Sequence, residues 1–124
     1  MEVALIPLSN KEEPDKSIWN AKELINRPIN KLPTLLDPIF PASGSIALAG
    51  GSDLGKSTFL RQFALSVSIG DNEFLGWKLN TKHQRAIYVS TEDDKDQITI
   101  SLKTFNNHRN LNSEKYEGVD FIFV

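Results

Sequence analysis

Apolar residues along the chain follow two different spacings, and each spacing predicts a different kind of element. Continuous apolar runs lie within residues 45–50, 85–90 and 119–124. Runs of this kind are typical of parallel strands that helices cover on both faces. Between the runs, apolar residues recur at helical spacing over about 56–69 and 94–106. The alternation of strands and helices predicts an α/β fold with a parallel sheet flanked by helices.

The N-terminal third carries a different pattern, because all six prolines lie there. Residues 1–16 predict a flexible leader. Residues 17–44 predict a lead-in segment, in which Ser17 caps a short helix, Pro28 ends it, and an extended, turn-rich stretch follows. The remaining residues, 45–124, form the third predicted region and hold the alternating strands and helices.

The amino-acid composition excludes several classes of protein but does not identify a function. The 124 residues carry 14 basic and 16 acidic side chains, a net charge of −2, which gives no global attraction to nucleic acid or to anionic membranes. Cysteine does not occur, so disulfides and thiolate metal sites are excluded. The apolar runs are shorter than the roughly 18–20 residues of a membrane span. Because the N-terminus lacks the features of a signal peptide, we expect a cytoplasmic protein without a membrane partner.

The loop between the first predicted strand and helix reads GGSDLGKS, residues 50–57, and fits the pattern G-x-x-x-x-G-K-[ST] in full. Its glycines let the backbone curl so that N–H groups converge on a phosphate chain. The helix that follows points its unpaired N–H groups at the same place. Lys56 adds a positive charge near the β- and γ-phosphates, and Ser57 offers Mg²⁺ a hydroxyl. The predicted nucleotide-binding residues are Gly50, Gly51, Ser52, Asp53, Leu54, Gly55, Lys56, Ser57 and Thr58.

The second predicted strand ends in three acidic residues, Glu92, Asp93 and Asp94. Ligands of open α/β sheets bind at this carboxyl edge, where a carboxylate can orient an attacking water. Spacing alone leaves Glu92 evenly divided between catalysis and solvation of the strand end. Asp93 and Asp94 fit the solvated strand end better, and Asp94 is a plausible N-cap of the next helix.

Three segments, SIALAGGSDLGKSTFLRQFALSVSIG, FLGW and RAIYVSTEDD, together resemble the RepA-like branch of the RecA-type P-loop ATPases. These are hexameric replicative helicases of plasmids and mobile elements, and the resemblance covers about residues 20–124. It implies that residues 45–124 are a partial RecA-like ATPase core that uses ATP and Mg²⁺. It further implies that Glu92 is the catalytic carboxylate beside Lys56, and that the partners are further copies of the chain and single-stranded DNA.

Three parts of such a motor do not occur in the sequence: a strand ending in the Asp that holds Mg²⁺ (Walker B), an arginine finger and DNA-binding loops. We therefore expect the chain to be the N-terminal part of a longer protein and inactive in isolation. Two alternatives remain open. One is a recombinase-like or regulatory ATPase that does not unwind DNA, and the other is a nucleotide-binding fragment without hydrolysis. ATP is expected over GTP, because no guanine-recognition signature occurs.

Other residues that could contact a ligand are better explained by packing or solvation. The aromatic side chains are interpreted as packing anchors: Trp19, Phe74 and Trp77. The basic cluster before the second strand is interpreted as a solvated loop rather than a DNA contact: Lys78, Lys82, His83 and Arg85. His83 and His108 have no carboxylate or thiol at ligand spacing, so neither is expected to bind a metal.

Overall fold

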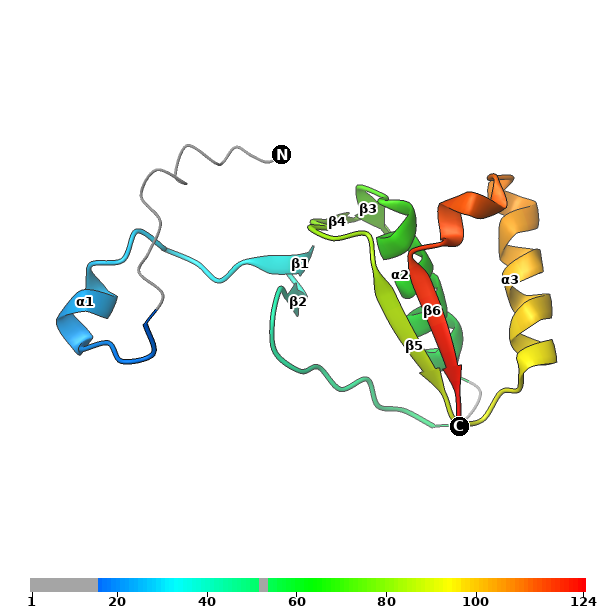
Figure 1. The fold of residues 1–124 in the computed structure, drawn as a ribbon, viewed down its shortest axis with the longest axis horizontal. Coiled ribbons are helices and arrows are strands. Elements are labelled where there is room, and N and C mark those ends of the chain that lie inside the picture. Colours follow the sequence, from blue (N-terminus) through cyan, green and yellow to red (C-terminus); the bar gives the residue numbers. More distant parts are fainter. Residues whose placement is uncertain (1–15, 52–53) are drawn as a thin grey trace. The chain divides into compact units, whose positions relative to one another are not determined.

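The computed structural model describes residues 16–51 and 54–124 (Figure 1). The chain divides into two compact units, Met1–Lys31 and Leu32–Val124, which are described separately. No helix in these described ranges is long and apolar enough to cross a membrane.

The described part of the first unit contains helix α1, Ala21–Ile25. Its N-cap is Asn20 and not Ser17, which corrects the expectation from sequence. The Asn20 side chain accepts a hydrogen bond from the backbone of Glu23 at 2.9 Å, and the Glu23 carboxylate accepts one from the Asn20 backbone at 2.8 Å. This reciprocal capping box satisfies two N–H groups at once, so it outcompetes a single serine cap.

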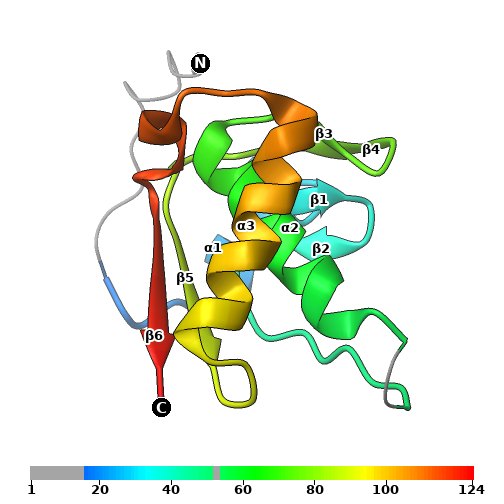
Figure 2. The same ribbon diagram turned by 90° about the vertical axis from the view of Figure 1, so that its right-hand side faces the viewer.

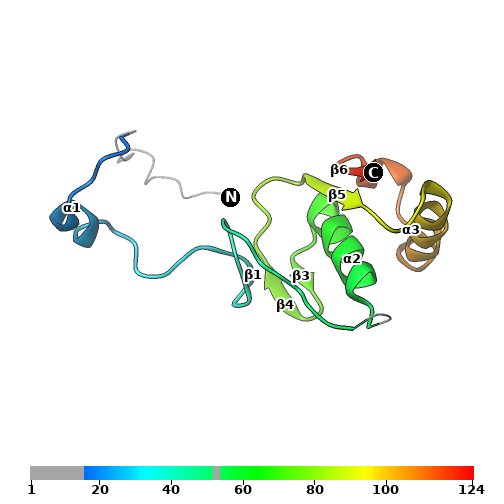
Figure 3. The same ribbon diagram turned by 90° about the horizontal axis from the view of Figure 1, so that it is seen from below.

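Helix α2, Lys56–Ile69, is the central element of the second unit. One side of it packs against strand β5, Ala86–Ser90, as the view from below shows (Figure 3). Strand β6, Val119–Phe123, pairs with β5 in parallel, so that Ala86 lies opposite Val119. The predicted helix over 56–69 is therefore confirmed, and of the predicted parallel sheet the structure shows the pair of β5 and β6.

Helix α3, Lys95–Arg109, connects β5 to β6 together with a short 3₁₀ helix, η2, Ser113–Tyr116 (Figure 2). Asp94 is its N-cap, as expected: its side chain accepts from the Gln97 backbone at 2.9 Å. The helix runs three residues beyond the predicted end at 106. Arg109 at its last turn donates two hydrogen bonds of 2.9 Å to Asp71, and this pairing keeps the last turn in place.

The other side of α2 covers a small antiparallel sheet with the order β2-β1-β4-β3. Its strands are β1 Thr34–Asp37, β2 Phe40–Pro41, β3 Glu73–Phe74 and β4 Trp77–Leu79. These strands lie in two stretches of the chain, 34–41 and 73–79. No strand was expected in either stretch, and for both of them the structure differs from the expectation. The pairing of Leu36 with Leu79 joins residues far apart in the chain, and strands this short leave no alternating pattern to read.

The main core lies between this sheet and α2. It consists of Leu36, Val67, Phe74 and Leu79, with the rings of Phe40, Phe59 and Phe63 packed against it. The interpretation of Phe74 as a packing anchor is confirmed, whereas Trp77 is 42% exposed on β4.

Two expectations about the parallel sheet are wrong. Residues 45–50 are not a strand in the structure. They have no ladder partner among the described strands, and Ile46 and Leu48 are about half exposed. In addition, helices cover only one face of β5 and β6 within the described residues. Ile87 on the other face is 68% exposed.

Candidate functional site

The glycine-rich loop leads into α2 without a side-chain cap. Gly55 is the N-cap and has a left-handed backbone, with φ of 82°. No acidic residue lies in the first turn. Within the described residues, no side-chain cap binds the first N–H groups of α2 and no acidic residue of the helix itself lies at the positive end of its dipole. These are the features that an anion requires at a helix start.

Lys56 folds back over this loop. Its ammonium donates hydrogen bonds to the backbone carbonyls of Gly50, at 2.9 Å, and Gly51, at 2.6 Å. A side chain at position 50 would crowd the loop, because a Cβ there would lie 3.0 Å from the Leu54 side chain. The lysine and the loop backbone thus form one compact group. Ser52 and Asp53, which the sequence also predicts as ligands, lie outside the described residues.

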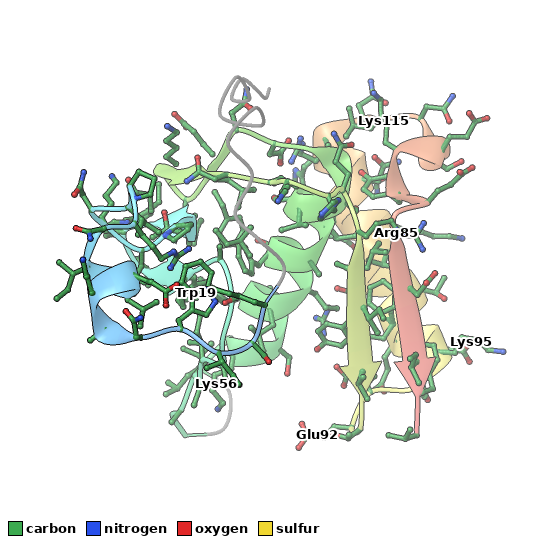
Figure 4. The ribbon with its side chains drawn as sticks, turned by 60° about the vertical axis from the view of Figure 1, so that its left-hand side comes forward. Trp19, Lys56, Arg85, Glu92, Lys95 and Lys115 are labelled. Carbon is green, nitrogen blue, oxygen red and sulfur yellow. The ribbon has the colours of Figure 1, made fainter. Side chains whose placement is uncertain are left out.

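Glu92 lies in the turn that follows β5, at the same end of the molecule as Lys56 (Figure 4). Ser57 at the start of α2 and Glu92 line one cavity of about 600 Å³, together with Asp93. The structure therefore brings two of the predicted site residues to one cavity from separate elements. Thr58 lies elsewhere and lines a hollow of about 230 Å³ between α2 and α3.

The turn that carries Glu92 is held by its neighbours. The buried Ser90 hydroxyl donates to the backbone carbonyl of Asp93 at 2.7 Å. The Asp93 carboxylate lies 3.3 Å from the guanidinium of Arg61 on α2. Asp94 begins α3 as its N-cap. Glu92 itself is exposed between these fixed points.

Sequence reasoning missed the contact between Arg61 and Asp93. It placed Asp93 on a solvated strand end and did not single out Arg61. A signal was available, because α2 contains only two charged residues, Lys56 and Arg61. Lys56 lies at the start of the helix, whereas Arg61 lies inside it, and a charge that is buried there needs an acidic partner.

The remaining candidates add no further ligand site. Arg85 lies 3.7 Å from the Asp120 carboxylate, and both side chains are solvent-exposed. Within residues 16–51 and 54–124, no group of three or more His, Asp or Glu side chains is arranged to hold a metal ion.

The family model described as "AAA domain" matches residues 10–121 of this chain. The matched range contains both the glycine-rich loop and the turn at Glu92. No curated protein and no solved structure matches the chain.

Proposed function

This chain belongs to the AAA domain family, and we propose that it binds ATP at the loop from Gly50 to Thr58 and hydrolyses it with the help of Glu92. Membership of the family itself suggests an ATPase in general terms. The observation that supports the specific site is the cavity that Ser57 and Glu92 line together. The cavity runs between α2 and β5 and is lined largely by their apolar residues, with Ser57 and Glu92 among its polar lining.

Binding would use groups that are already directed at the loop. The uncapped N–H groups at the start of α2 would donate to phosphate oxygens. Lys56, which donates to two loop carbonyls, would gain charged acceptors, and hydrogen bonds between charged groups are about twice as strong as neutral ones. Ser57 would hold Mg²⁺ together with the nucleotide, and the ion would neutralise charge on the phosphates.

Hydrolysis would need one carboxylate beside the γ-phosphate. In the proposed step, the Glu92 carboxylate accepts a hydrogen bond from a water and orients it. The water oxygen forms a bond to the γ-phosphorus, while the bond from that phosphorus to the bridging oxygen breaks. ADP leaves with the bridging oxygen, and the proton of the water passes to the carboxylate or to the released phosphate. Lys56 stabilises the charge that develops on the phosphate oxygens.

The biological use of this ATPase is a further step of the proposal. The resemblance of the loop and of the Ser90–Asp93 segment to the RepA-like branch supports a RecA-type core in a hexameric replicative helicase that acts on single-stranded DNA. A recombinase-like or regulatory ATPase would share the same site. An unwinding assay on forked DNA separates these functions, since only the helicase releases a strand.

The test of the proposed site is Glu92→Gln in the full-length protein. Loss of the carboxylate charge removes the water-orienting group but leaves the phosphate-binding loop intact. We expect ATP affinity to stay within about twofold of wild type while turnover falls about 100-fold or more. Glu117→Gln, a matched change in an exposed glutamate after η2, should hydrolyse ATP at the normal rate. Normal turnover in Glu92→Gln would rule out the catalytic assignment.

A further inference from the structure

Arg61 lies on α2, little more than one turn beyond the phosphate-binding residues. Its side chain is almost entirely buried, with the residue 9% exposed. Its guanidinium Nη1 lies 3.3 Å from Asp93 Oδ2, and Asp93 directly follows Glu92 in the chain. A single ion pair therefore joins the helix that begins with Lys56 and Ser57 to the turn that carries the candidate catalytic carboxylate.

The ion pair of Arg61 and Asp93 has a geometry that contributes little to the stability of the fold. Burying a charged group costs free energy unless its hydrogen bonds are satisfied, and apolar residues of similar size often stabilise as well or better. Here the contact is single and rather long, and Arg61 Nε has no hydrogen-bond partner in the part of the chain that the structure describes. An apolar side chain at this position would pack on α2 without this cost. The arginine therefore calls for an explanation other than stability.

The location of the contact between Arg61 and Asp93 explains why an arginine stands at this position. Ser90 fixes the turn through the Asp93 carbonyl, and Asp94 fixes the start of α3. Both bonds hold the turn to its own strand or helix, and neither reaches α2. Among the side-chain hydrogen bonds that the described residues make in this turn, the one to Arg61 reaches α2, and it adds to the packing of α2 on β5 a direct link between the phosphate-binding helix and the turn of Glu92.

We propose that Arg61 and Asp93 are positioning residues that fix Glu92 relative to Lys56 and Ser57. The inference rests on the proposed function, because it assigns the pair a role in ATP hydrolysis. Neither residue needs to touch the nucleotide. When phosphates bind at the start of α2, the ion pair holds the turn at a fixed distance from the helix. The Glu92 carboxylate and the γ-phosphate then keep the same relative position. A misplacement of about 1 Å at a reacting group can cost about 100-fold in rate.

The test separates turnover from binding in the full-length protein. In Arg61→Met and Asp93→Asn we expect kcat to fall about 10- to 100-fold, while the dissociation constant of a fluorescent ATP analogue changes less than about threefold. The double variant should lose no more than the more affected single variant, because both changes break one contact. Arg61→Lys keeps the charge and should retain more turnover than Arg61→Met.

The matched control is the ion pair just beyond the C-terminal end of α2, between Asp71 and Arg109 on α3. Arg109→Met should lower the thermal midpoint of unfolding and leave kcat unchanged. If Arg61→Met lowers kcat and ATP affinity together, in step with a loss of stability like that of Arg109→Met, the pair is only structural and the proposal is overturned. Normal turnover in both Arg61→Met and Asp93→Asn overturns it as well. Glu92→Gln tests the proposed function independently, since it leaves the pair intact.

Discussion

The two ends of α2 differ in how far the chain satisfies its own polar groups. At the C-terminal end, the Gly70 N–H donates to the carbonyls of Ser66 and Val67 at 3.1 and 3.2 Å. Asp71 follows, and its carboxylate accepts two hydrogen bonds from Arg109. Backbone carbonyls and side-chain charges are therefore paired within the protein, which is the usual closure of a helix.

The N-terminal end is left open. Gly55 offers no side-chain cap, and Lys56 donates to loop carbonyls. Further along the helix, Arg61 pairs with Asp93, while its Nε has no hydrogen-bond partner among the described residues. The C-terminal end of α2 thus contributes stability, whereas the N-terminal end keeps donors for a ligand. Each prediction below changes one end and measures whether this division holds.

The largest effect is expected for a core residue in the C-terminal half of α2. Leu65 is 2% exposed, so Leu65→Ala should leave a cavity and lower the free energy of unfolding by about 2–5 kcal/mol. Leu54 at the other end is 70% exposed, and Leu54→Ala should change it by less than about 0.5 kcal/mol. Urea denaturation of both variants measures the difference. Equal losses would contradict the division between the two ends.

A smaller effect is expected at the glycine that starts α2. Gly55 has a φ of 82°, where a side chain costs about 1–2 kcal/mol. Gly55→Ala should lower the stability by this amount and weaken ATP binding, because the strain would displace the loop backbone. Gly51→Ala is the matched control for stability, since Gly51 has no positive φ and no atom within 4 Å of an added Cβ. An unchanged unfolding curve for Gly55→Ala would show that the loop relaxes freely.

The smallest effect is expected for the ion pair at the closed end. The bidentate hydrogen bonds from Arg109 lower the pKa of Asp71 below its ordinary value of 3.8. The pair therefore stabilises the fold above that value and loses its effect as the pH falls through the lower, folded pKa. Arg109→Met should cost about 1 kcal/mol at neutral pH.

The pH dependence checks this cause. The difference in unfolding free energy between wild type and Arg109→Met should be constant between about pH 5 and 7 and shrink below about pH 4. A difference that persists unchanged at pH 2 would assign the loss to packing of the arginine side chain rather than to its charge.

Local signals predicted the parts of the fold that local interactions determine. The stripe of apolar residues and Gly70 located α2, and Asp94 located the start of α3. The strand expected at residues 45–50 did not appear, because a strand needs a paired neighbour and an apolar run alone does not supply one. The small antiparallel sheet was not predicted, because its strands pair across a long stretch of sequence. Leu36, for example, pairs with Leu79, and no local pattern indicates this pairing.

The candidate site shows the same division. The loop pattern specified Lys56 and Ser57 from the sequence, because each residue type in it has a direct chemical task. The expected position of Glu92 near the γ-phosphate depended on a strand at 45–50 beside β5, and residues 45–50 are not a strand. The shared cavity of Ser57 and Glu92 became visible only in the structure, and the catalytic role of Glu92 stays a proposal. The contact between Arg61 and Asp93 was not predicted, because 32 residues separate the two in the chain.

The most direct test of the account is the affinity for ATP of Lys56→Ala compared with Lys115→Ala. Lys115 lies on η2, away from Lys56 (Figure 4), so its loss controls for the removal of a positive charge. Titration of a fluorescent ATP analogue with Mg²⁺ present measures both. The account predicts that Lys56→Ala loses detectable binding and that Lys115→Ala binds like wild type. Wild-type affinity in Lys56→Ala would contradict the claim that this loop holds the nucleotide.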